Sequence, residues 1–458
     1  MKPKINKVKF YQGPLVNKII IYTIPILLTN MFNLFYNASD MVIVGKFAGK
    51  LALSAVGSTG TIINMIISLF MGLSVGSSIL VSKYFAAQEN ENLSQSIHCS
   101  IAVAVIGGIA ITILGNIFIN PLLNLMKVPD DIFPLATLYL RIYFIGMPFT
   151  LIYNFAAAIL RAVGDSKRPL FFLVISGVIN VILNLIFVIL LKMSVAGVAT
   201  ATIISQAISM ILALRCLINQ TDSMKLCYSK IKIYKTKAID ILKIGLPAGL
   251  QNFCGAISNA SIQSAVNSMG STVIAGNSAS ASLEGFIFQA MASFGQTNST
   301  VASQCVGAGQ YKRSNKSLYT NLLLAIISAI IMCGLFSFFK YDLINLYNND
   351  PEVIEVGVLR LKIYCAFGFT AGMINVFTGH LRGIGYPTLP TIIVIFGMCV
   401  LRFFWSLVVF DFFPKLEILY LVYPISWAVT SLSLFIAYKI VRKKLPKDDI
   451  PLKLDDEC

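Results

Sequence analysis

Charged residues are scarce in this sequence. They make up 12% of its 458 residues, whereas soluble domains carry about 25%. Acidic residues number only 20, and hydrophobic residues reach 57%. So little charge excludes an ordinary soluble domain and predicts an integral membrane protein. The net charge of +16 does not indicate nucleic-acid binding, because Lys and Arg gather in a few connections between apolar runs.

Motifs for metal and nucleotide chemistry are also missing. There are two His, and the nine Cys include no C-x-x-C pair, so the sequence has no zinc or disulfide pattern. It contains no G-x-x-x-x-G-K-[ST] motif, which excludes direct use of ATP, and no H-E-x-x-H motif. We therefore expect neither an enzyme nor a bound cofactor.

Long apolar runs are present in their place. Runs of about 20 residues or more, enough to cross a bilayer core of ~30 Å as a helix, recur about twelve times. They are continuous and do not alternate, which predicts helices and excludes barrel strands. We place them near 17–44, 52–81, 97–119, 136–160, 169–191, 195–218, 240–269, 273–302, 318–339, 357–380, 388–411 and 416–440.

The twelve runs form two similar halves. The segment 160–164 (LRAVG) recurs as 381–385 (LRGIG), and 37–39 (NAS) recurs as 259–261 (NAS). Six spans in each half give both halves the same topology, so we predict parallel six-helix repeats in a 6+6, all-α membrane protein. The predicted parts are an N-terminal lobe (1–219), a Lys-rich linker (220–239) and a C-terminal lobe (240–458).

Lys and Arg concentrate in two segments. Seven lie from Arg215 to Lys243, and more lie from Lys439 onward. Positive residues accumulate in cytoplasmic loops, so the sequence predicts a multi-pass plasma-membrane protein with both termini and the linker inside the cell. Anionic lipid headgroups are the expected partners of this charge. We expect a monomer.

One acid breaks the symmetry of the repeat. Asp40 follows the first Asn-Ala-Ser, whereas Ile262 follows the second. A carboxylate within a bilayer is costly unless it is paired or hydrated, so such acids usually serve function. Burial disfavours the charged form of a carboxyl group, which makes Asp40 a candidate proton carrier. The alternative is an interfacial acid near the end of its helix.

Polar residues on later helices are candidate partners of Asp40. Asn180 and Asn184 are four residues apart and share a helix face. Together with Thr202 they could supply oxygen ligands to a cation or hydrogen bonds to Asp40. The alternative is ordinary hydrogen bonding between helices.

A second set of polar residues is predicted to line a substrate cavity. Glu284 lies in a run too polar to face lipid. Arg402 is expected to pair with an acid or to extend to the membrane surface, and His98 and His380 are expected at interfacial helix ends. The full cavity set is Tyr139, Asn154, Glu284 and Asn375.

Two prolines lie within the first helix of each half. Proline removes a backbone hydrogen bond and clashes with the preceding turn, so Pro25 and Pro247 should bend these helices. The bends are either static kinks or hinges whose angle changes during transport.

The pattern resembles one known family, the multidrug and toxic-compound extrusion (MATE) transporters. The resemblance covers nearly the whole chain and is carried by 37–45 (NASDMVIVG), 160–166 (LRAVGDS), 195–202 (VAGVATAT) and the repeat. It implies two six-helix lobes around a central cavity and export against a proton or sodium gradient. The 82–96 loop lacks the signature of the major facilitator class, the other large twelve-helix class.

The resemblance also assigns site residues. It maps the family's first-helix acid onto Asp40 and its N-lobe cation site onto Asn180, Asn184 and Thr202. Members with a well-formed sodium site often have Asp where this chain has Asn184. Gly255 and Ala371 fall where a sodium-coupled branch has acids. These departures weaken the case for sodium, although a sodium site at Asp40 stays open.

The sequence therefore predicts a secondary antiporter that exports cationic or amphipathic organic compounds, driven by H⁺ or Na⁺. A related alternative is a flippase or exporter of a lipid-linked saccharide or other amphiphile. Such a protein would need several cations along its cavity, and few are embedded here: Arg402, with Arg141, Arg360 and Lys362 as further candidates. A third alternative, from another class, is a non-transporting membrane sensor.

Overall fold

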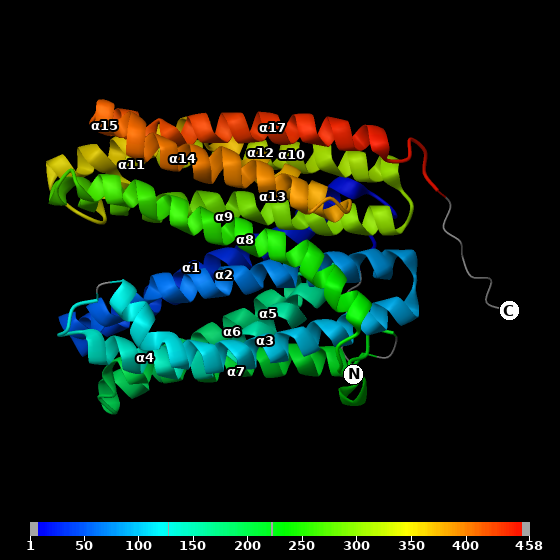
Figure 1. Cartoon of the computed structure of the whole chain (residues 1–458), viewed down its shortest axis with the longest axis horizontal. Helices are drawn as coiled ribbons and strands as arrows, with labels where there is room; N and C mark the ends of the chain where they lie inside the picture. Colours follow the sequence, from blue (N-terminus) through cyan, green and yellow to red (C-terminus); the bar gives the residue numbers. More distant parts are fainter. Residues whose placement is uncertain (1–7, 127, 221–222, 451–458) are drawn as a thin grey trace. The chain divides into compact units, whose positions relative to one another are not determined.

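The computed structural model describes residues 8–126, 128–220 and 223–450, and within these residues every regular element is helical. Each of the twelve predicted runs corresponds to a helix or to joined helices (Figure 1). By length and composition, eight segments of the described chain qualify as membrane spans, and the pair α4 and α5, bent by 47°, makes a ninth. Three long helices, α8, α9 and α12, are too polar to qualify by composition.

The first repeat consists of helices α1 to α7, with two π-helical turns, η1 and η2. Their bounds are α1 Leu15–Ile43, η1 Val44–Ala48, α2 Lys50–Ala87, α3 Asn90–Leu125, α4 Phe133–Ile145, α5 Met147–Ala162, α6 Lys167–Asn184, η2 Leu185–Leu190 and α7 Ser194–Ile218.

The second repeat follows a short 3₁₀ turn, η3 (Tyr228–Lys230). Its elements are α8 Lys235–Asn267, α9 Ser271–Gly307, α10 Tyr311–Phe338, α11 Lys340–Asn345, α12 Pro351–Gly383, α13 Thr388–Val394, η4 Ile395–Val400, α14 Leu401–Phe404, η5 Trp405–Val409, α15 Phe410–Phe412, α16 Leu416–Tyr420 and α17 Val422–Lys444.

The chain forms two compact units. The N-unit contains Ile24–Gly249 with the chain up to Lys9, and the C-unit contains Phe10–Thr23 and the chain from Leu250 onward. These bounds differ from the predicted lobes, 1–219 and 240–458. The predicted division lay in the linker, whereas the structure divides within α1 and α8, beside Pro25 and Pro247.

Local packing explains the division of α1. The start of α1 and the turn before it pack on α9 within the C-unit. Phe10 N donates to Gln304 Oε1 at 3.0 Å, and the hydroxyls of Thr23 and Thr297 are 2.9 Å apart. These contacts make the first turns of α1 part of the C-unit.

Glycine explains the division of α8. Its first turns pack on α2 within the N-unit. A Cβ at Gly72 would lie 2.0 Å from the backbone N of Gly249, so only glycine allows this backbone approach. The first turns of α1 therefore belong to the C-unit, and the first turns of α8 belong to the N-unit.

The linker is fixed to the N-unit. Lys237 is buried and donates to Asn92 Oδ1 at 2.7 Å and to Tyr84 OH at 2.9 Å. His98 is also buried, and its Nε2 accepts from Cys227 N at 2.9 Å. His380 is likewise buried, and both histidines lie near helix ends, His98 near the start of α3 and His380 in the last turn of α12.

Candidate functional site

Four predicted residues meet around one carboxylate in the N-unit. Asp40 is 7% exposed, on the last turns of α1. Asn184 Nδ2 donates to Asp40 Oδ1 at 2.6 Å, and Thr202 Oγ1 donates to Asp40 Oδ2 at 3.4 Å. Asn184 Nδ2 also donates to Asn180 Oδ1 at 3.0 Å. Helices α1, α6 and α7 thus bring together the predicted ion-coupling set.

Tyrosines complete the surroundings of this carboxylate. Tyr36 lies one helical turn before Asp40, and its hydroxyl is 2.6 Å from Ser205 Oγ on α7. Tyr139 is 5% exposed, and its ring centroid lies 5.9 Å from that of Tyr143. Its predicted place in the substrate cavity stays a prediction. Tyr36 and Ser205 were not predicted, although helical spacing places them beside Asp40 and Thr202.

Asp40 forms no ion pair with any residue that the structure describes. Two buried amide atoms beside it, Asn180 Nδ2 and Asn184 Oδ1, also have no hydrogen-bond partner. Unpaired buried polar groups are costly, so they usually indicate a ligand, water or ion. The site therefore keeps one donor and one acceptor whose hydrogen bonds the described residues do not supply.

Two of the three helices that carry this site, α1 and α6, change from α to π winding beside it. α1 continues as the π turn η1 directly after Ile43, and α6 continues as η2 directly after Asn184. π turns are frequent at functional sites because they displace the backbone hydrogen-bond ladder. The Asp40 site is thus at the least regular part of both helices.

The residues present fit a proton more closely than sodium. Asn184 presents its N–H₂ group, not its oxygen, to Asp40 and Asn180. Sodium prefers oxygen ligands, so the Asn184 amide would first have to turn its free Oδ1 inward. With the amide turned, Asp40, Asn180, Asn184 and Thr202 could supply oxygens to a sodium ion.

Glu284 does not offer a free charge to a cavity. It is 5% exposed in the C-unit, and Arg360 binds both of its oxygens, with Nε–Oε1 and Nη2–Oε2 distances of 2.7 Å. Arg360 Nη1 also donates to Asn277, and Tyr420 OH donates to the same Asn277 oxygen at 3.2 Å. Arg360 on α12 therefore neutralises Glu284, and the predicted place of Glu284 in the substrate cavity stays a prediction.

Arg402 has no carboxylate partner among the described residues. It is 4% exposed, donates to Ser426 Oγ at 3.1 Å and to Asn259 Oδ1 at 3.3 Å, and lies 4.8 Å from the Tyr423 ring centroid. The expectation that it pairs with an acid or extends to the surface is therefore wrong. Neutral acceptors and an aromatic face stabilise it instead.

The two predicted cavity asparagines do not join the Asp40 site. Asn154 donates to Thr150 O at 2.9 Å and Asn375 to Ala371 O at 3.0 Å, each within its own helix. Pro25 and Pro247 lie inside the continuous helices α1 and α8. The predicted substrate contacts of Asn154 and Asn375 stay predictions, and so do the predicted bends at Pro25 and Pro247.

Comparison with known families accounts for the repeat. A family model described as MatE matches residues 25–186 and again residues 247–408, which together make up more than half of the chain. The chain belongs to the MatE family. MatE proteins are transporters, so this protein is a membrane transporter and not an enzyme.

Individual relatives agree with this assignment. The chain is 26% identical over 438 residues to "Probable multidrug resistance protein YoeA" of Bacillus subtilis (strain 168), covering 93% of each chain. It is 28% identical over 394 residues to "Probable multidrug resistance protein YpnP" of the same organism, covering 86% of this chain and 88% of the relative. The structure described as "Crystal structure of MATE in complex with MaL6" shares the fold, with a TM-score of 0.90, 20% identity and coverage of 96% and 99%.

The MatE repeat also shows where the two halves diverge. The two Asn-Ala-Ser segments place Ile262 at the position of Asp40, with the offset of 222 that also relates the starts of the two matched ranges. The second half thus lacks the acid.

Proposed function

We propose that this MatE protein is a proton-coupled exporter of cationic or amphipathic organic compounds in the plasma membrane, with its termini and linker on the cytoplasmic side. The observation that carries the proposal is the buried Asp40 carboxylate without an ion-pair partner among the described residues. Such a group is neutralised in turn by a proton or by a cationic substrate, and this exchange couples the two fluxes.

The hydrogen bonds at Asp40 support the proton as the coupling ion. In the geometry of the structure, both neighbours donate, which suits the ionised carboxylate. A protonated Asp40 can still accept from Asn184 with its carbonyl oxygen, but its other oxygen becomes an O–H donor, so the hydrogen bond with the Thr202 hydroxyl rearranges. Because Asp40 lies on α1, we expect this local change to shift α1, the helix that contains Pro25.

The relatives' names support organic compounds as substrates, since two of them are named multidrug resistance proteins. The flippase alternative finds less support. It requires cations free to bind phosphate, whereas Arg360 is held by Glu284 and Arg402 is buried among neutral groups.

Transport in proteoliposomes tests the proposal. Vesicles holding the purified protein receive a fluorescent organic cation, and a pH gradient or a sodium gradient is imposed separately. We expect the pH gradient alone to drive accumulation, and a sodium gradient at equal pH to have no effect. Protein-free vesicles control for passive movement of the cation. Sodium-driven accumulation without a pH gradient would overturn proton coupling.

Replacing Asn184 with Asp should create a response to sodium. The new carboxylate would lie about as close to Asp40 as the present amide does. Two carboxylates at this distance repel each other and compete for one proton, and a cation between them relieves the repulsion. We expect sodium, but not potassium, to raise the unfolding temperature of Asn184→Asp and to leave that of the native protein unchanged. An equal response of both proteins would show that the native site already binds sodium.

A further inference from the structure

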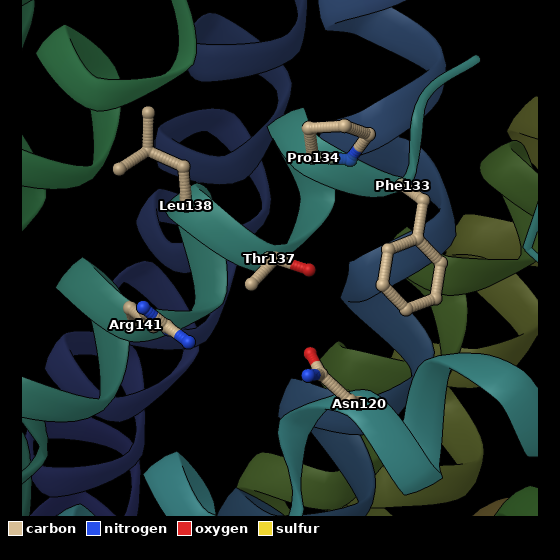
Figure 2. Close-up of a pocket in the computed structure, with 6 residues that line it drawn as sticks. All are labelled: Asn120, Phe133, Pro134, Thr137, Leu138 and Arg141. Carbon is tan, nitrogen blue, oxygen red and sulfur yellow. The ribbon is translucent and has the colours of Figure 1, made fainter. Parts of the chain in front are cut away.

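A pocket of about 370 Å³ lies in the N-unit, where the last turns of α3 meet the first turns of α4. Figure 2 shows the side chains of Asn120 and Thr137 pointing toward the same open space, with Arg141 at its edge. Phe133, Pro134 and Leu138 form its apolar walls. The pocket belongs to neither of the clusters around Asp40 and Glu284.

All three polar groups of the pocket lack a protein partner. Thr137 Oγ1 is buried without a hydrogen bond, although a helical Thr usually bonds the carbonyl four residues earlier. The side chains of Asn120 and Arg141 form no hydrogen bond or ion pair with the described residues, and this includes the nearby acids Asp130 and Asp131. One buried hydroxyl and two exposed groups, the Asn120 amide and the Arg141 guanidinium, therefore converge without a partner among the described residues.

The surface around the pocket is that of a bilayer-facing helix. α3 exposes a row of large apolar side chains leading toward Asn120, with Ile113 55%, Ile117 63% and Phe118 51% exposed. Arg141 is eight residues after Phe133, which places its Cα ~12 Å along α4 from the start of the helix. A long Arg side chain at this depth reaches the headgroup region of the membrane.

We propose that this pocket binds one anionic phospholipid, with its phosphate and ester oxygens at Arg141, Thr137 and Asn120 and its acyl chain along Leu138 and the apolar face of α3. The guanidinium and phosphate are complementary in charge and hydrogen-bond geometry. The lipid belongs to the leaflet opposite the α2–α3 turn, because α3 crosses the membrane between that turn and the pocket.

A phospholipid fits this pocket better than free phosphate does. Most of the wall is apolar, and the polar groups come from both α3 and α4. An amphiphile uses both parts, whereas inorganic phosphate would leave the apolar wall uncovered. The inference does not depend on the coupling ion or the exported compound, so it stands apart from the proposed function.

Native mass spectrometry tests the proposal. Full-length protein, stripped of lipid in detergent, is titrated with phosphatidylglycerol or phosphatidylcholine, and dissociation constants of the bound lipids are measured. The variants are Arg141→Gln and Thr137→Val. Lys362→Gln is the matched control, because Lys362 is the exposed counterpart of Arg141 in the second repeat. A photoreactive phosphatidylglycerol then maps the contacting peptides.

The native protein should bind one phosphatidylglycerol more tightly than all others, crosslinked to residues 117–141. Arg141→Gln should weaken the affinity for that lipid about tenfold, which is the loss expected of one charged hydrogen-bonded contact. Thr137→Val should weaken the affinity by a smaller factor. Lys362→Gln should leave it unchanged. Equal effects of Arg141→Gln and Lys362→Gln, or displacement by millimolar inorganic phosphate, would overturn the proposal. If Arg141→Gln fails to fold, an unchanged affinity in Thr137→Val overturns it.

Discussion

Asp40→Asn is expected to abolish uphill export while leaving the protein folded. The amide has the shape of the carboxylate, so its oxygen can still accept from Asn184, and its N–H₂ group can donate to the Thr202 hydroxyl. A neutral amide also costs less to bury than a carboxylate, so stability should not fall. The amide cannot bind and release a proton, so the variant cannot exchange a proton for substrate at this position.

The measurement is pH-gradient-driven accumulation in proteoliposomes, beside substrate binding and thermal unfolding in detergent. Accumulation should fall to the level of protein-free vesicles, while some substrate binding survives and the unfolding temperature stays close to native. Asp411→Asn is the matched control, because Asp411 is an exposed acid of the second repeat. If Asp40→Asn accumulates substrate at the native rate, another group couples the fluxes.

The Asp40 cluster could be predicted from sequence because several constraints agree. Helical spacing places Asn180 and Asn184 on one face, and the family resemblance points to the same acid, amides and hydroxyl. The structure adds the direction of each hydrogen bond. Sequence could not give that direction, since either end of an amide can face a neighbour until the other groups are placed.

The C-unit cluster was harder to predict. Glu284 and Arg360 are 76 residues apart, and no local pattern pairs an acid on one helix with a base on another. The pairing depends on how closely α9 and α12 approach: a Cβ at Gly379 would lie 2.2 Å from Gly295 O. Glycine spacing indicates close packing but not which helix is the partner.

Divergence between the repeats explains why one unit carries the proposed coupling. Asp40 in the first half corresponds to Ile262 in the second. The buried Arg402 of the second half carries a permanent positive charge. The second half therefore keeps a static polar core, in which the Arg360 and Glu284 charges neutralise each other.

Removing one partner of that ion pair should destabilise the protein strongly. Glu284→Ala leaves the Arg360 guanidinium buried without its carboxylate, and breaking a buried pair in this way costs about 3–5 kcal/mol. Arg360→Ala should cost a similar amount. We expect both variants to unfold at clearly lower temperature in detergent and to reach the membrane in smaller amounts than the native protein.

The double variant Glu284→Leu with Arg360→Met separates structural from transport roles. It removes both charges and keeps apolar volume, and such replacements of buried pairs are often neutral. Asn277 Oδ1 retains its bond from Tyr420, so little of the network is left unsatisfied. The double variant should regain most of the native stability and gradient-driven export. If it regains stability but not export, Glu284 or Arg360 takes part in transport itself.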